Sequence, residues 1–157
     1  MQRILLAWDD RGHAEAASQW VRRKLLADPT VEVTVLYVTV LAASPRFAGP
    51  RWSSDYDREI AHAIKARLEY DVFDGLGDRV RFLHESGISV SDVIVAAAEV
   101  LRCPMIVLGG RPPRGFRRWV GGGVGAEVLR KTDASVLVIR APSRPMPVRG
   151  PWARTGL

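Results

Sequence analysis

The feature that most constrains this fold is a stretch that joins an apolar run to a helical pattern through glycines. Met105 to Leu108 is continuously apolar and ends at Gly109-Gly110, and a second glycine group precedes the helical pattern near Ala126. A strand, a glycine-rich turn and a helix N-terminus gather unpaired backbone N–H groups, and the helix dipole favours negative charge there. The stretch therefore predicts a candidate anion site. The alternative is that the glycines only form a tight turn.

The rest of the chain repeats the same alternation of strand and helix. Ile4 to Trp8 is apolar without interruption, which is typical of a strand covered on both faces of a parallel sheet. We expect further strands over residues 31–38, 80–84, 105–108 and 135–139, with amphipathic helices between them. Residues 39–54, which contain prolines and a glycine, are interpreted as a loop. This order predicts an α/β domain with a mostly parallel sheet and right-handed crossovers.

Two local patterns sharpen the boundaries. Ser89 with Asp92 three residues later is a capping-box pattern and predicts a helix N-terminus there. The strand over residues 80–84 is less apolar than the others, so we place it nearer a sheet edge. From Ala141 onward, prolines alternate with arginines. We therefore divide the chain into an α/β domain over residues 1–141 and a disordered tail over 142–157.

Composition bounds the class of protein. The 157 residues are enough for one domain with a substantial core. No apolar run approaches the roughly 18 residues that span a bilayer, and Asp9-Asp10 ends the N-terminal apolar run early. A single cysteine, Cys103, excludes an internal disulfide and is expected to be a packed thiol. We expect a cytoplasmic protein.

The net charge of +6 is unevenly distributed. From residue 111 onward there are ten arginines and lysines against two acidic residues, whereas residues 1–110 are slightly acidic. Such asymmetry is compatible with an anionic partner. Arginine also outnumbers lysine 20 to 3, which a bias of genome composition explains equally well.

Three segments together resemble the universal stress protein family: ILLAWDD at the start, LYV at the end of the second expected strand, and VLGGR…GGGVGAEVLRKTDASVLVIR. The resemblance covers about residues 3–140. It implies a Rossmann-like, adenine nucleotide alpha hydrolase-like fold, with a five-stranded parallel sheet of order 3-2-1-4-5 and helices on both faces. Ligands of such sheets bind beyond the carboxyl ends of the strands, where the order reverses.

The family also implies an adenine-nucleotide site in some members. Its motif places glycines at Gly109 and Gly122, an acidic residue that meets the nucleoside at Asp9, and a backbone contact to adenine at Val38. The basic loop adds arginines as phosphate ligands. The cofactor implied is ATP or another adenine nucleotide, with Mg²⁺ only in its company. The candidate nucleotide-binding residues are Asp9, Val38, Gly109, Arg111, Gly122, Gly123, Val124 and Gly125.

This chain departs from the motif at several positions. Pro112 stands where the motif has its second glycine, and Gly123 and Gly125 stand where it has hydroxyl residues. Each hydroxyl bond to phosphate is worth about 1.5–3 kcal/mol. Losing two corresponds to roughly 10²- to 10⁴-fold in affinity. Trp8 also occupies a position where the family commonly has a smaller side chain.

Other chemistries have less support. No Walker-type glycine-lysine pattern is present, and His13, His62 and His84 lack metal-ligand spacing. Tryptophans near arginines in expected loops suggest nucleic-acid binding, but no known module supports it. Without a recognisable nucleophile set we expect at most weak ATP hydrolysis.

The final strand suggests a partner. Val136 to Ile139 would lie at the sheet edge, where an apolar strand invites pairing, and family members commonly dimerise there. We expect a homodimer. The function implied is a stress-linked binding or regulatory protein that carries or senses an adenine nucleotide. The alternatives are a nucleotide-independent dimeric adaptor and a weak ATPase.

Overall fold

The computed structural model of the chain describes residues 2–9, 12–41, 54–110 and 123–140. The proposed tail, the loop arginines, Pro112 and Gly122 therefore lie outside the described residues. In chain order the elements are β1 Gln2–Trp8, α1 Gly12–Ala27, β2 Val31–Val40, α2 Ser54–Asp71, the 3-10 turn η1 Gly77–Arg79, β3 Val80–Gly87, α3 Val90–Val100, β4 Met105–Gly110, α4 Val124–Lys131 and β5 Ser135–Arg140.

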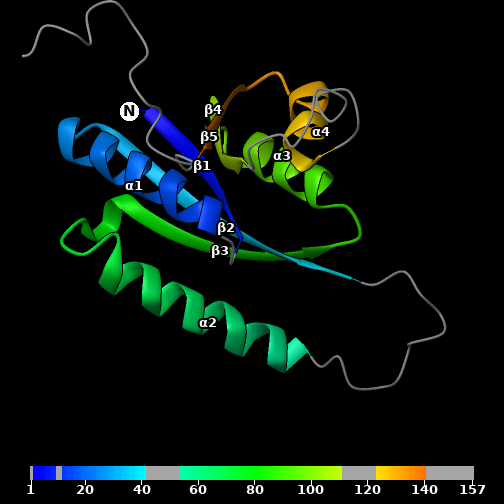
Figure 1. Cartoon of the computed structure of the whole chain (residues 1–157), viewed down its shortest axis with the longest axis horizontal. Coiled ribbons are helices and arrows are strands. Elements are labelled where there is room, and N and C mark those ends of the chain that lie inside the picture. Colours follow the sequence, from blue (N-terminus) through cyan, green and yellow to red (C-terminus); the bar gives the residue numbers. More distant parts are fainter. Residues whose placement is uncertain (1, 10–11, 42–53, 111–122, 141–157) are drawn as a thin grey trace, which may run out of the picture.

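The sheet has the order β3-β2-β1-β4-β5, and all its strand pairs are parallel. The predicted topology is confirmed, with β3 and β5 at the two edges. Figure 1 shows α1 and α2 on one side of the sheet and α3 and α4 on the other. The chain order reverses between β1 and β4, so the carboxyl ends of these two strands form the switch point of the fold.

Alternation along β1 divides the core into two layers. Ile4, Leu6 and Trp8 pack into the cluster beneath α1 and α2, whereas Leu5 and Ala7 pack against the side chains beneath α3 and α4. Ile4, Leu5 and Leu6 are fully buried. β1 is therefore apolar from Ile4 to Trp8, where both of its faces are covered.

The predicted strands were too short: β1 begins at Gln2, β4 continues to Gly110 and β5 continues to Arg140. Thr39 and Val40 belong to β2 rather than to a loop, and β3 continues to Gly87 instead of ending at His84. The extensions of β2 and β3 have one cause, because Val38 to Val40 pairs with Glu85 to Gly87. Backbone pairing between strands overrides weak local strand propensity.

The cap of α3 is as predicted. Ser89 is the N-cap residue, and its hydroxyl accepts a hydrogen bond from the backbone N–H of Asp92. Two residues after the end of α3, Arg102 has a positive φ of 53°. The N–H of Cys103 bonds to the carbonyl of Ala98. This is the Schellman arrangement of a helix C-terminus. Cys103 is a buried free thiol, as expected, and burial raises its pKa.

Candidate functional site

Three of the predicted site residues meet at the switch point. β1 pairs with β2 through Trp8 and Tyr37, so that Asp9, the next residue, follows on beside Val38. On the other side of β1, Ala7 pairs with Leu108, the residue before Gly109. Asp9 is exposed and Val38 is half-buried. The strands thus bring a carboxylate, a backbone segment of β2 and the end of β4 to one edge.

Gly109 has a packing role that is visible without any ligand. A Cβ at this position would lie 2.5 Å from the carbonyl oxygen of His13 and 2.8 Å from the backbone nitrogen of Ala14. The colliding atoms belong to the helix backbone, so no side-chain rotation relieves the contact. The absence of a side chain at Gly109 therefore lets the first turn of α1 rest directly on the end of β4.

The start of α4 also belongs to this edge. Gly123 is the N-cap residue, and its carbonyl accepts bonds from the N–H groups of Ala126 and Glu127. Among the described residues, no side chain caps the helix, and a Cβ built on Gly123 would meet none of their atoms within 4 Å. Uncapped N–H groups at a helix N-terminus are candidates for an acceptor on a bound anion. Val124, which begins the helix, is also exposed.

Gly125 differs from Gly123. Its Cβ position lies 3.6 Å from Leu108 Cδ1 and 3.9 Å from Val138 Cγ2, which is ordinary packing distance. A small side chain is therefore sterically acceptable at Gly125. The predicted contributions of Arg111 and Gly122 fall outside the described residues, as does the segment that joins β4 to Gly123.

Trp8 is not directed at the α3 and α4 side of the edge. Its ring is buried in the core cluster beneath α1 and α2, where it lies 6.4 Å from the ring of Tyr37. Within the described part of the chain, Trp8 Nε1 and His13 Nδ1 are buried without a hydrogen-bond partner. The large side chain of Trp8 therefore packs in the core on the face of the sheet that α1 and α2 cover, opposite to α4.

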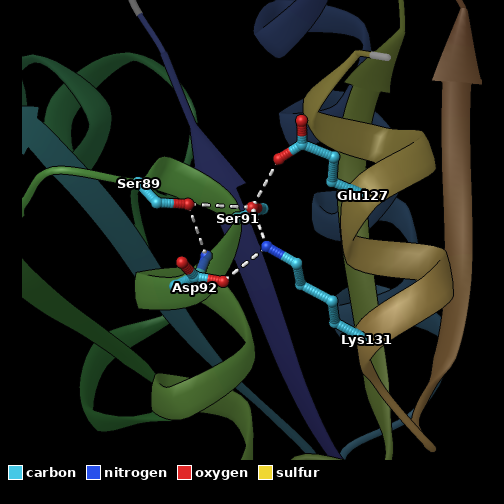
Figure 2. A network of polar contacts seen from close by, with 5 residues as sticks. All are labelled: Ser89, Ser91, Asp92, Glu127 and Lys131. Carbon is cyan, nitrogen blue, oxygen red and sulfur yellow. Dashed lines mark hydrogen bonds and ion pairs between the residues drawn. The ribbon is translucent and has the colours of Figure 1, made fainter. Parts of the chain in front are cut away.

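A polar network attaches α4 to α3 (Figure 2). At its centre is Ser91, 1% exposed, whose hydroxyl donates to Glu127 Oε2 over 2.7 Å and accepts from Lys131 Nζ over 3.1 Å. Ser89 Oγ lies 3.1 Å from Ser91 Oγ. The buried hydroxyl is fully satisfied, and both turns of α4 are held.

Lys131 also forms an ion pair with Asp92, with Nζ 2.6 Å from Oδ1. The hydrogen bond from Lys131, followed by that with Ser89, lowers the pKa of the Asp92 carboxyl. Both side chains are largely exposed, so this pair contributes less than the buried contacts of Ser91. The sequence analysis did not predict this network. Its only sequence signal is a serine facing inward in the first turn of an apolar helix.

A metal site of the protein's own has no support in the described segments. Within them, no three or more histidine, cysteine, aspartate or glutamate side chains group together to hold an ion. Nor does any helix in those segments have the length and apolarity needed to cross a membrane. Of the two aspartates that follow β1, the structure describes Asp9, whereas Asp10 lies outside the described residues.

The comparisons with known proteins agree on one family. A sequence profile of the universal stress protein family matches residues 1–140. Among solved structures, the universal stress protein UspA from Lactobacillus plantarum has a TM-score of 0.69 at 24% identity, covering 88% of this chain and 97% of that one. A search of curated protein sequences found no match.

Two further solved structures carry nucleotides. The universal stress protein from Archaeoglobus fulgidus in complex with dAMP has a TM-score of 0.61 at 18% identity, covering 88% of this chain and 98% of that one. A universal stress protein in complex with cAMP has a TM-score of 0.59 at 13% identity, covering 88% and 96%. At these identities the likeness shows the fold alone, a Rossmann-like α/β domain with a parallel five-stranded sheet.

Proposed function

The chain belongs to the universal stress protein family, and we propose that it binds an adenine nucleotide at the carboxyl edge of β1 and β4. In this role it acts as a binding or regulatory protein of the stress response, without efficient catalysis. The observation that carries the proposal is the uncapped N-terminus of α4 with open space at Gly123. Exposed helix N–H groups beside an open surface suit a phosphate.

The orientation of the nucleotide follows from the two ends of the edge. Asp9 and Val38 lie on the β2 side, where the carboxylate accepts from ribose or adenine donors and the backbone of Val38 pairs with the adenine edge. The phosphates then reach the turn of Gly123, Val124 and Gly125. Relatives that bind dAMP and cAMP support an adenine ligand. Gly109 serves this site indirectly by holding α1, while Arg111 and Gly122 are proposed phosphate contacts.

Mg²⁺ is proposed only as a companion of the phosphates. A hard cation with few protein ligands keeps most of its waters and is held by phosphate oxygens and one or two carboxylates. Asp9 is the carboxylate placed for this. Without the two hydroxyls of the family motif, binding rests on backbone N–H groups and arginines, so we expect micromolar to millimolar affinity.

Calorimetric titration with ATP and AMP, each with and without Mg²⁺, tests the proposal. We expect saturable heat with both nucleotides and a roughly tenfold or larger loss with Asp9→Asn, since a charged hydrogen bond contributes about 1.5–3 kcal/mol. Asp74→Asn is the matched control. Asp74 is an exposed carboxylate in the connection between α2 and β3, at the amino ends of the strands and thus away from the proposed site. A silent titration at millimolar nucleotide rejects nucleotide binding.

Restoring hydroxyls tests where the phosphates lie. Gly123 has open space and Gly125 has ordinary packing distance, so serine fits at both positions. Gly123→Ser with Gly125→Ser is expected to strengthen ATP binding by at least tenfold and to change adenosine binding little. Equal affinity of wild type and variant for ATP would place the phosphates elsewhere.

A dimeric adaptor is the second candidate, and one observation favours it. β5 is an edge strand, and Val138 on it is 44% exposed. An apolar edge strand is suited to antiparallel pairing with a second copy. We propose a homodimer through Val136 to Ile139. Light scattering behind size exclusion is expected to give twice 17.4 kDa at micromolar concentration, and Val138→Lys is expected to give monomers.

Cytoplasmic location is part of both proposals. Weak ATP hydrolysis ranks third, measurable as phosphate release that Asp9→Asn removes.

A further inference from the structure

A row of three rings crosses the sheet on the face covered by α1 and α2. Trp8 pairs with Tyr37 in the strand register, and Tyr37 pairs with His84. The ring centroids are 6.4 Å apart between Trp8 and Tyr37 and 5.7 Å apart between Tyr37 and His84. Thr39 Oγ1 lies 2.8 Å from His84 Nε2 and fixes the orientation of that ring. The ring planes are tilted by 55° between Trp8 and Tyr37 and by 31° between Tyr37 and His84, so the row is an ordered but uneven aromatic surface.

The outer part of this row forms one wall of a cavity beneath α2. The cavity has a volume of about 300 Å³ and lies between the strand residues Tyr37, Phe82 and His84 and the helix α2. Figure 1 shows α2 running alongside β3 at the margin of the domain. Apolar contacts from Val35 and Ile64 complete the wall. The interior is thus aromatic and aliphatic, as in most small-molecule sites.

The charged side chains that the structure describes at the mouth of the cavity are basic. Arg58, His62 and Lys65 line it from α2, and none of the lining residues that the structure describes is acidic. Lys65 also pairs with Glu69 at 3.6 Å, but both side chains are about half exposed. Such a pair is weak and is readily exchanged for a better-placed anion. A guanidinium and an ammonium group beside an apolar cavity can each donate hydrogen bonds to an anionic group at the mouth.

We propose that this cavity is a second ligand site, for a small aromatic carboxylate. The ring stacks against Tyr37 and His84 within the cavity, and the carboxylate stays at the mouth between Arg58 and Lys65. A volume of about 300 Å³ is at the lower limit of ligand cavities, which suits a single ring and excludes a nucleotide. The site lies on the opposite face of the sheet from Gly123, so it stands or falls separately from the nucleotide proposal.

The probes are benzoate and 4-hydroxybenzoate. Benzamide is the matched control without the negative charge, and cyclohexanecarboxylate is the matched control without the aromatic ring. The chain has three histidines, and two of them, His62 and His84, line the cavity. Their ring proton resonances report binding directly. We expect both to shift saturably with benzoate at millimolar concentration while the resonances of His13 stay unchanged, and each matched control to bind at least about tenfold more weakly.

Surface variants separate the charge from folding. The double change Arg58→Gln with Lys65→Gln is expected to weaken benzoate binding by at least about tenfold without loss of thermal stability. Arg67→Gln is the control, because Arg67 lies on α2 but does not line the cavity. Three results would overturn the proposal: no shift of His62 and His84, equal binding of benzamide and benzoate, or equal benzoate affinity in the double variant and in Arg67→Gln.

Discussion

Two helices, α1 and α4, begin at the same edge of the sheet but are held there by different means. α1 rests with its backbone on Gly109, and the contact leaves no room for a single added carbon. α4 begins in open space at Gly123 and is held through side chains one and two turns later, where Glu127 and Lys131 reach Ser91 on α3. The edge therefore combines one rigid steric attachment with one polar attachment that leaves the helix N-terminus exposed.

The two glycines of this one motif therefore have different structural roles. Gly109 is required by packing whether or not a ligand binds, whereas Gly123 has no steric requirement in the structure. Glycine at the first position is thus weak support for a nucleotide site. The open amide groups at the second position are stronger support, because helix N-termini are normally capped by a side chain.

The largest expected effect is at Gly109. Gly109→Ala places a methyl group against the backbone of His13 and Ala14, and neither the helix nor β4 moves without disturbing the core. We expect a loss of about 3 kcal/mol in the free energy of unfolding, at the upper end of overpacking effects. Urea denaturation measures it. Gly123→Ala is the control and is expected to lose under about 1 kcal/mol. Equal losses would mean that the two glycines are not distinguished by packing.

The polar attachment is expected to be weaker. Ser91→Ala removes the centre of the network and leaves the remaining groups partly unpaired, so we expect a loss of about 1–2 kcal/mol and faster amide exchange in α4. Ser18→Ala is the matched control, since Ser18 is also a buried helical serine but bonds only to Ala14 of its own helix. If both variants lose the same stability, Ser91 acts as a local residue rather than as the link between α3 and α4.

Much of this edge was predictable from sequence, and the rest was not, for physical reasons. The uninterrupted apolar run of β1, the glycines after β4 and the Ser89 cap are local signals that fix strand, turn and helix. The network of Ser91, Glu127 and Lys131 joins residues 36 and 40 positions apart, and no local pattern specifies it. The steric role of Gly109 has the same origin, because the helix it contacts is distant in sequence.

The pairing of Asp92 with Lys131 makes the stability of the polar attachment between α3 and α4 depend on pH. The pKa of Asp92 is lowered from 3.8 by its hydrogen bonds to Lys131 and Ser89, so the folded state holds the charged form more strongly than the unfolded chain does. This stabilisation is fully present above pH 3.8 and is lost as pH falls through the lowered value. Thermal melting of wild type and Asp92→Asn is expected to differ at neutral pH and to converge in acid below the lowered pKa of Asp92. Asp74→Asn, as control, is expected to melt like wild type throughout. A difference that persists in strong acid would exclude the ion pair as its cause.

The smallest expected effect is Gly123→Ser, and it bears most directly on the open end of α4. In the protein without nucleotide, serine at an N-cap position accepts from the backbone N–H groups of the first turn, and the space around Gly123 accommodates its side chain. We expect a gain of only a few tenths of a kcal/mol, because glycine is already tolerated at N-caps. Urea denaturation measures this gain in the free energy of unfolding most clearly against Gly123→Ala. The alanine variant lacks the hydroxyl and is expected to be less stable than wild type. A serine variant as unstable as the alanine variant would mean that the first-turn amides already have an acceptor, and the open anion site at α4 would then be excluded.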